Sequence, residues 1–285
     1  MRAGFIGLGN LGRAMATRLQ QQDVALSAWN RTAEKGRSLG LPVAASPAAL
    51  IGDQEAVLMC LADSDAVEVV LRGREGLLAG ECAGKLIIDL TTNHHAPVQL
   101  FHQLCKQKGA RYVEAPVAGS VVPALAGKLV AMVSGEPQDV DAARPYLEPL
   151  TASIHELGAP GQATRMKLVN NLCLGTIMAV VGEALATAEA AGISREQALA
   201  VLAEGGGKSL VLDAKRQKLE DRDWSPHFSV GMIAKDLHCL QDLARELGRP
   251  QHLAGVVKEQ YMRLVAAGHG DEDFAAIADL FERGH

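Results

Sequence analysis

Short apolar runs alternate with amphipathic segments through the first half of the chain. The runs predict strands at residues 3–6, 24–29, 56–61, 86–89, 112–114, 129–133 and 154–156. Between them, residues 13–21, 47–51, 64–71 and 97–108 have the apolar spacing of helices that bury one face. Alternation of this kind indicates parallel strands joined by crossover helices, and therefore an α/β doubly wound sheet.

The pattern changes at Gly158-Ala-Pro-Gly161, after which we predict no strand. Residues 163–191 contain no proline and predict one helix that is about 40 Å long at about 1.5 Å per residue. Gly192 ends this helix, and Ser194-Arg-Glu-Gln197 has the form of a capping box for the next one. Helical patterns continue over residues 208–220, 231–247, 253–267 and 272–283. We therefore expect an α/β domain over residues 1–161 and an all-α domain over residues 162–285.

Composition and charge exclude several classes of partner. The 285 residues are 48% hydrophobic, which is enough for sizeable cores, and the net charge of −5 provides no basic surface for nucleic acid or an anionic membrane. The most apolar stretch, residues 168–191, is interrupted by Asn170, Asn171, Glu183 and Glu189, so we interpret it as a buried helix rather than a membrane span. The chain opens directly on a predicted strand, so we expect no targeting segment and a cytoplasmic protein.

The cysteines indicate no metal site and no disulfide framework. The five cysteines have neither CxxC nor zinc-site spacing; they are Cys60, Cys82, Cys105, Cys173 and Cys239. An odd number of separated thiols fits a reducing compartment, where cysteine serves as a small core residue.

A glycine-rich turn joins the first predicted strand to the first predicted helix. Gly7-Leu8-Gly9-Asn10-Leu11-Gly12 fits a dinucleotide pyrophosphate, because Gly7 permits the turn, Gly9 lets the backbone approach phosphate and Gly12 lets helix and strand pack closely. The phosphates then lie at the positive end of a helix. The alternative is a structural glycine turn, but the strand and helix around it favour the dinucleotide.

The end of the second predicted strand bears on which dinucleotide is bound. An acidic residue there would accept the 2′-hydroxyl of NAD, but the chain has Asn30-Arg31-Thr32 instead. Arg31 offers a permanent charge and a planar fork of donors, which suits the 2′-phosphate of NADP. We therefore predict that NADPH is preferred and NAD is the lesser cofactor. The alternative is that Arg31 is only a solvated loop residue.

A lysine lies near the start of the long apolar helix. Lys167 and Asn171 are four residues apart and therefore share a helix face. Burying an unpaired ammonium group is costly, so a lysine on an apolar face favours a chemical role over a structural one. A lysine that extends its charged end to solvent is the alternative.

Three segments, together with the glycine turn, resemble the β-hydroxyacid dehydrogenase family over essentially the whole chain. They are Glu114-Ala-Pro-Val-Ala-Gly-Ser120, Gly158-x-x-Gly161 continuing to Lys167-x-x-Asn170-Asn171, and Phe228 through Lys235-Asp236. The family includes 3-hydroxyisobutyrate dehydrogenases, tartronate semialdehyde reductases and glyoxylate/succinic semialdehyde reductases, and the last branch is closest in motif. The resemblance implies a Rossmann-type domain followed by an all-α domain that the long helix opens.

The resemblance also implies roles for particular residues. Lys167 would be the general acid and base, with Asn171 as its partner. Gly119, Ser120, Thr92, Phe228 and Asp236 would bind substrate, while Leu61, Ala62, Thr92 and Lys235 would join the glycine turn in holding the cofactor. Ala62 replaces a proline that is usual in the family, and Ala118 replaces a serine, which removes one hydroxyl from the turn that grips a substrate carboxylate.

These observations predict an NADPH-dependent reductase of small carboxylate-bearing aldehydes, such as succinic semialdehyde, glyoxylate or tartronate semialdehyde, acting also in reverse. One alternative is an NAD(P)-dependent 3-hydroxyisobutyrate or related dehydrogenase. An alternative of another class is a non-catalytic NADP-binding sensor or scaffold, although such relatives lose the lysine that this chain keeps. Imine reductases usually lack it too, and a 6-phosphogluconate dehydrogenase has a larger helical domain. We also expect a homodimer or homotetramer.

Overall fold

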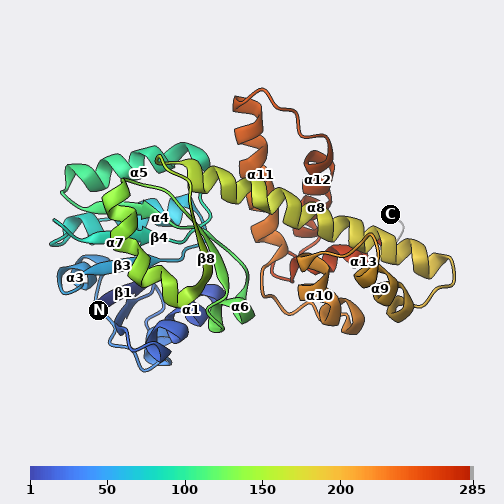
Figure 1. The fold of residues 1–285 in the computed structure, drawn as a ribbon, viewed down its shortest axis with the longest axis horizontal. Helices are drawn as coiled ribbons and strands as arrows, with labels where there is room; N and C mark the ends of the chain where they lie inside the picture. Colours follow the sequence, from blue (N-terminus) through green and yellow to red (C-terminus); the bar gives the residue numbers. More distant parts are fainter. Residues whose placement is uncertain (283–285) are drawn as a thin grey trace. The chain divides into compact units, whose positions relative to one another are not determined.

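Five of the apolar runs form a parallel sheet in the computed structural model, which describes residues 1–282 (Figure 1). The strands are β1 (Arg2–Ile6), β2 (Ala25–Trp29), β3 (Ala56–Met59), β4 (Leu86–Asp89) and β5 (Arg111–Glu114), in the order β2-β1-β3-β4-β5. All four pairings between neighbours are parallel. The parallel, doubly wound sheet that the sequence predicts is therefore confirmed.

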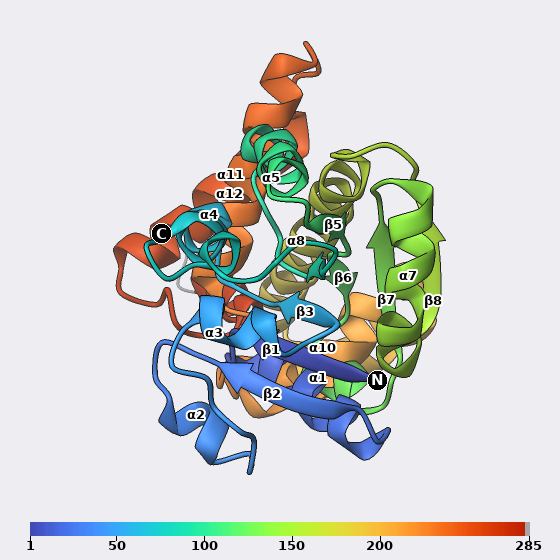
Figure 2. The same ribbon diagram turned by 90° about the vertical axis from the view of Figure 1, so that its left-hand side faces the viewer.

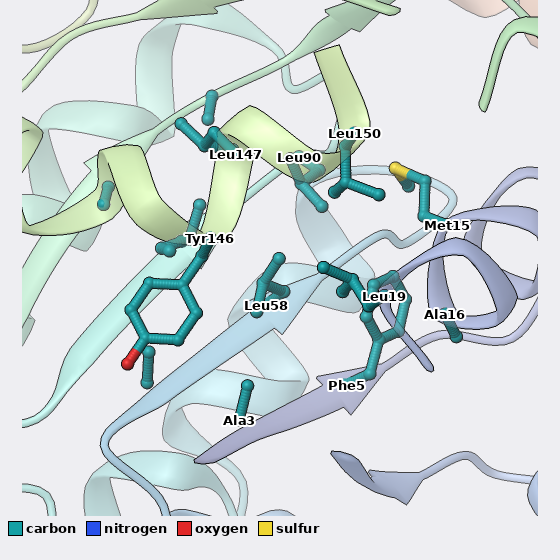
Figure 3. Close-up of a cluster of buried hydrophobic side chains, with 14 of the residues drawn as sticks. Ala3, Phe5, Met15, Ala16, Leu19, Leu58, Leu90, Tyr146, Leu147 and Leu150 are labelled. Atoms are coloured by element: carbon teal, nitrogen blue, oxygen red, sulfur yellow. The ribbon is translucent and has the colours of Figure 1, made fainter. Parts of the chain in front are cut away.

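Side chains alternate between the two faces of this sheet, and each face has its own helices. On one face, Phe5 and Leu58 pack with α1 (Asn10–Gln21) and α7 (Pro137–Leu147), as Figure 3 shows. On the other face, Ile6 and Met59 pack with α3 (Pro47–Gly52), α4 (Ser64–Arg72) and α5 (His95–Gln107). Because adjacent residues of a strand point to opposite faces, a run such as Phe5-Ile6 contributes to both cores.

The remaining strands form a separate sheet of three, which the alternation of strands and helices did not indicate. It consists of β6 (Val117–Ala118), β7 (Leu129–Val133) and β8 (Thr151–Glu156) in that order. Strand β6 runs antiparallel to β7, whereas β8 runs parallel to it. Figure 2 shows β7 and β8 together, with α7 beside them. The two-residue strand β6, the short helices α2 (Glu34–Arg37) and α6 (Val121–Leu125), and helix α7 were not predicted.

The second half of the chain is helical over its described residues. Helix α8 (Gln162–Ala190) has 29 residues and is followed by the predicted capping box at Ser194 and Gln197. The others are α9 (Arg195–Glu204), α10 (Leu210–Asp221), α11 (Val230–Glu246), α12 (His252–Ala266) and α13 (Ile277–Glu282). The predicted helix over residues 272–283 divides into a 3₁₀ turn, Phe274–Ala276, and α13, and its last predicted residue lies outside the described range.

Two glycines let other elements approach α8 closely. A Cβ on Gly175 would lie 3.2 Å from side-chain carbons of Ile233 and Leu237 on α11. A Cβ on Gly182 would lie 2.9 Å from the Cα atom of Ala278 on α13. These residues are seven apart and lie on one side of the helix, so they explain why α8 tolerates residues of poor helix propensity.

Contacts between Cα atoms divide the chain into a unit that ends at Lys167 and a second that begins at Leu168. The division falls inside α8, whereas the domain boundary predicted at residues 161 and 162 coincides with the start of that helix. By length and composition α8 could cross a membrane, since an 18-residue window has a mean hydropathy of 1.6, and 44% of it is buried within the protein. Glu189 on the same helix pairs with Arg195, as expected of a helix that packs within a protein.

Candidate functional site

The glycine turn has the geometry of an anion cradle. Gly7 has φ +92, and a Cβ on it would lie 2.1 Å from the carbonyl oxygen of Cys60. A Cβ on Gly12 would lie 1.9 Å from the carbonyl oxygen of Gly7, whereas nothing lies within 4 Å of the Cβ position of Gly9. The first intrahelical hydrogen bond of α1 runs from Arg13 N to Gly9 O at 2.8 Å. The backbone N–H groups at the start of a helix have no helical partner and can bind phosphate. The open space at Gly9 lies where the phosphates are expected.

Asn30 braces this turn. Its Oδ1 accepts a hydrogen bond from Leu8 N at 2.9 Å, and its Nδ2 donates to Thr32 O at 2.9 Å. Both ends of the amide therefore bind the protein itself. Asn30 shapes the turn, in addition to the role in cofactor binding that the sequence predicts. Arg31 is exposed beside it. Of the three predicted residues, Arg31 has the charge and the access that a 2′-phosphate requires.

The predicted cofactor and substrate residues of the first unit follow the carboxyl edge of the parallel sheet. Asn30 to Thr32 follow β2, Gly7 to Gly12 follow β1, Leu61 and Ala62 follow β3, Thr92 follows β4, and the segment containing Gly119 and Ser120 follows β5. The structure thus brings to one edge segments that are far apart in sequence. Ligands of open α/β sheets bind at this edge.

A buried carboxylate holds the loop that carries Thr92. The Oδ1 of Asp89 accepts from Thr91 N at 2.9 Å, and its Oδ2 accepts from Asn93 Nδ2 at 2.8 Å and from Tyr112 Oη at 2.6 Å. Thr91 Oγ1 in turn accepts from Leu61 N at 3.0 Å. Burial raises the pKa of Asp89 above its usual value, although these hydrogen bonds act in the opposite direction. Both neighbours of Thr92 are therefore fixed.

The turn predicted to hold a substrate carboxylate contains a glycine in a conformation that other residues avoid. Gly119 has φ +120, and a Cβ there would lie 2.6 Å from Leu129 Cδ2. Ser120 stands at the N-cap of α6, but its side chain makes no capping hydrogen bond. The hydroxyl of Ser120 is therefore not used to cap this helix, and Ala118 in β6 supplies no second hydroxyl.

Lys167 and Asn171 lie one turn apart on α8. The side chain of Lys167 is only 7% exposed, and Asn171 is fully buried. Asn171 Nδ2 donates to Asp236 Oδ2 at 2.5 Å, and its Oδ1 accepts from Asn170 Nδ2 at 3.1 Å. Lys235 Nζ lies 2.9 Å from the other oxygen of Asp236, an ion pair in which both partners lie on α11. The predicted residues Asn171, Lys235 and Asp236 thus form one connected cluster.

Phe228 lies in a loop that a buried ion pair fixes. Its ring meets Phe274 edge to face, with 5.8 Å between ring centroids. Asp273 Oδ2 accepts from His227 N at 2.9 Å and from Lys215 Nζ at 2.7 Å. Burial lowers the pKa of Lys215, although Asp273 acts to raise it. The predicted wall residue is therefore held by groups that sequence reasoning did not single out.

Sequence reasoning assigned no individual role to the buried acids Asp89, Glu114, Asp139 and Asp273. Asp89 and Glu114 each end a buried strand of the sheet, which is the signal that could have found them. The thiols take no part in these clusters: all five cysteines are free, and burial raises the pKa of Cys60 to about 12. Over residues 1–282, no group of three or more His, Cys, Asp or Glu side chains could hold a metal ion.

Family models match nearly the whole chain. The NAD binding domain of 6-phosphogluconate dehydrogenase matches residues 2–158, and the NAD-binding region of NADP-dependent 3-hydroxyisobutyrate dehydrogenase matches residues 161–281. The chain belongs to the 3-hydroxyisobutyrate dehydrogenase family. It therefore has the NAD(P)-binding domains of that family, and the resemblance drawn from its motifs is confirmed, as is the Rossmann-type sheet with its helical C-terminal part.

Curated relatives of this family include reductases of similar length. The 3-sulfolactaldehyde reductase of Escherichia coli (strain K12) is 31% identical, over 96% of this chain and 94% of the relative. Glyoxylate/succinic semialdehyde reductase 1 of Arabidopsis thaliana is 29% identical, over 98% of both chains, and supports the predicted branch. The cytokine-like nuclear factor N-PAC of Mus musculus is 30% identical over 97% of this chain, which spans only 50% of that protein.

Two solved structures have the same fold. A 3-hydroxyisobutyrate dehydrogenase from Salmonella typhimurium superposes with a TM-score of 0.89 at 25% identity, covering 99% of this chain and 100% of that one. Psf3, solved in complex with NADP⁺ and 2-OPP, also has a TM-score of 0.89, at 29% identity, covering 98% of this chain and 99% of the other.

Two glycine substitutions should separate the architecture of the turn from its ligand contact. Gly12→Ala should lower the melting temperature, because its Cβ would meet backbone that cannot move away cheaply. Gly9→Ala should leave the melting temperature unchanged and weaken NADPH, because its Cβ has space in the protein but fills the approach of the phosphates. Thermal unfolding and a fluorescence titration with NADPH measure both. Unchanged NADPH affinity in Gly9→Ala would argue against the cradle.

Arg31→Ala should weaken NADPH and leave NADH nearly unaffected. Loss of a charge-assisted contact with the 2′-phosphate costs about 1.5–3 kcal/mol, or roughly ten- to a hundredfold, mostly in the Michaelis constant. Steady-state kinetics with both cofactors check this. An equal loss with both cofactors would show that Arg31 does not read the 2′-phosphate.

Proposed function

We propose that this chain is an NADPH-dependent reductase of small carboxylate-bearing aldehydes, such as succinic semialdehyde, glyoxylate or tartronate semialdehyde, and catalyses the reverse oxidation. One observation carries the proposal. Lys167 is 7% exposed on α8, one turn before an asparagine that Asp236 holds. A lysine buried beside an oriented amide places a proton donor next to a hydrogen-bond donor, and this arrangement favours a chemical role.

The residues of the first unit fit the cofactor. The cradle of Gly7 to Gly12 would hold the pyrophosphate, with the open space at Gly9 admitting phosphate oxygens. Arg31 would hold the 2′-phosphate, and Leu61, Ala62 and Thr92 would border the rest of the cofactor along the sheet edge. When bound, NADPH supplies the hydride that reduces the carbonyl carbon.

Lys167 handles the charge and the proton of the reaction. As an ammonium group, its Nζ stabilises the negative charge that develops on the carbonyl oxygen and then gives that oxygen a proton. In oxidation the neutral amine accepts the proton from the hydroxyl group. Asp236 fixes the amide of Asn171 through one N–H, and an amide nitrogen has a second N–H that can donate to the same oxygen.

The acid group of the substrate would bind the turn after β6. The N–H of Gly119 and the hydroxyl of Ser120, which does not cap α6, supply donors for a carboxylate. Thr92 would add a hydroxyl, and Phe228 would form an apolar wall. The names of two relatives support this class, because 3-sulfolactaldehyde and succinic semialdehyde are both aldehydes that bear an acid group.

An NAD(P)-dependent 3-hydroxyisobutyrate dehydrogenase is the second candidate. It is favoured by the structural likeness to two proteins of that name, from Salmonella typhimurium and Mycobacterium tuberculosis, with TM-scores of 0.89 and 0.85. A non-catalytic NADP-binding sensor or scaffold is a candidate of another class, and the likeness to N-PAC, whose name is that of a nuclear factor, favours it. The retained Lys167 supports the enzyme over the scaffold.

The exposed apolar residues and the thiols support proposals for the assembly and the location. Val169 and Val180 on α8 are 43% and 58% exposed, and apolar exposure of this kind supports a homodimer or homotetramer. Sedimentation velocity of the full chain measures this. Five free cysteines fit a reducing compartment, which supports the proposal of a cytoplasmic enzyme.

Lys167→Ala should lower the turnover number by about a hundredfold or more, the usual scale for the loss of a general acid. The NADPH dissociation constant should stay the same, since the cradle is untouched. Lys167→Arg is the matched variant, because it keeps the positive charge but gives up its proton far less readily, and it should also be slow. Turnover near the wild-type rate in both variants would show that the proton comes from another group.

A substrate panel should show succinic semialdehyde, glyoxylate and tartronate semialdehyde reduced with NADPH faster than 3-hydroxyisobutyrate is oxidised with NAD. Ala118 removes a hydroxyl and leaves space, so we expect the pocket to accept chains of two to four carbons. A closely fitted pocket would instead discriminate between them by about 1–3 kcal/mol for each methylene group. Faster oxidation of 3-hydroxyisobutyrate would favour the second candidate. Reaction of uncharged aldehydes or imines alone would exclude the carboxylate role of Gly119 and Ser120.

A further inference from the structure

Glu114 is a buried carboxylate at which α5, the end of β7 and the start of α8 meet. It ends β5 and is 1% exposed. Its Oε1 accepts from His102 Nε2 at 3.0 Å, from Ser134 Oγ at 3.2 Å and from Gly161 N. Its Oε2 accepts from Thr164 N at 3.1 Å and from Thr164 Oγ1 at 2.5 Å. Burial alone would raise the pKa of Glu114, but the hydrogen bonds from His102, Thr164 and Gly161 hold it below its usual value, so the group is ionised.

The start of α8 depends on this carboxylate because the helix has no capping side chain of its own. The residue before the helix is Gly161, which has φ +93. The N–H groups of Gly161 and Thr164 donate to Glu114, and that of Ala163 donates to Ser134 Oγ at 3.0 Å. The ladder of α8 begins only with Arg165 N and Gly161 O. A negative charge at the positive end of a helix is also favourable.

Two predicted parts of the site are continuous with the groups that Glu114 joins. Lys167 follows Thr164 by three residues, which is less than one helical turn. The turn of Gly119 and Ser120 begins five residues after Glu114, through the short strand β6. The carboxylate therefore fixes the start of the helix that carries the proton donor and the end of the strand that leads to the acid-binding turn.

We propose that Glu114 is a positioning residue that sets the place of Lys167 through the first turn of α8, and that it acts on the rate of turnover rather than on cofactor affinity. This inference rests on the function proposed above. The glycine cradle follows β1, and β3 and β4 separate β1 from β5 in the sheet. Loss of the Glu114 contacts should therefore leave NADPH binding in place.

Glu114→Gln tests the proposal because the variant keeps the size of the side chain but replaces one of its two acceptor oxygens with an NH2 donor. Glu114 accepts all five hydrogen bonds, so an amide nitrogen in place of either oxygen would face N–H or O–H donors. The first turn of α8 should then shift. A misplacement of about 1 Å can cost on the order of a hundredfold, so we expect the turnover number to fall by roughly ten- to a hundredfold. The NADPH dissociation constant, from fluorescence titration of the full chain, should be unchanged.

Two further variants separate positioning from loss of stability. Asp139→Asn is the matched control, because Asp139 is a buried carboxylate on α7 in the same unit, 3.7 Å from Arg111. Burial raises the pKa of Asp139, so its charge does not stabilise the fold, and Asp139→Asn should lower neither the melting temperature nor turnover. Thr164→Val removes only the hydroxyl donor and leaves the backbone bond to Glu114. It should lower turnover in the same direction by less, and it carries the test if Glu114→Gln does not fold.

The double variant with Lys167→Ala decides how Glu114 acts. If Glu114 works through Lys167, Glu114→Gln (or Thr164→Val) should add no further loss to Lys167→Ala. Losses that multiply, or a Glu114→Gln enzyme that is less stable but turns over normally, would overturn the positioning role and leave the proposed function intact. Normal turnover by Lys167→Ala alone would overturn the proposed proton donor and the positioning role together.

Discussion

The first turn of α8 cannot satisfy its own backbone, and the site is organised around the groups that do so. A glycine precedes the helix, so the N–H groups that a serine or aspartate would normally cap are bound by Glu114 and Ser134, at the ends of β5 and β7. The same hydrogen bonds compensate the burial of the Glu114 carboxylate, because a buried charge is tolerated when it accepts several hydrogen bonds. The helix start and the buried acid therefore satisfy each other's hydrogen-bonding groups.

The neighbouring strands β4 and β5 each end in a buried acid, but the pKa values of the two acids shift in opposite directions. Asp89 and Glu114 are partners in the register of β4 and β5, and each ends its strand as a buried acid. The pKa of Asp89 is raised because burial dominates over its neutral donors, whereas the pKa of Glu114 is lowered by His102 and the start of α8. Asp89 holds the loop of Thr92, and Glu114 holds the helix of Lys167. The edge of the sheet is thus rigid where the chemistry is expected.

The pattern of apolar residues predicted the elements that depend on residues close together in sequence. All seven predicted strands exist, and the capping box at Ser194 is present, because alternation and local spacing determine them. Strand β6 has two residues, too few for a pattern to form. The role of Glu114 could not be predicted, because its donors on Gly161 and Thr164 lie 47 and 50 residues away, and only the fold brings them together. Family resemblance singled out Asn171 and Asp236 separately, and the hydrogen bond that joins them across 65 residues comes from packing.

The brace formed by Asn30 limits how cofactor preference can change. An aspartate at this position is the simplest route toward the acidic residue that binds the ribose of NAD. It would still accept the hydrogen bond from Leu8 N, but it would lose the donor to Thr32 O and put a carboxylate against a carbonyl oxygen. The same side chain therefore braces the glycine turn and stands at the position where we expect the nucleotide to be distinguished. A lineage that exchanged one cofactor for the other would have to alter the loop of Thr32 as well, so the two properties cannot evolve independently.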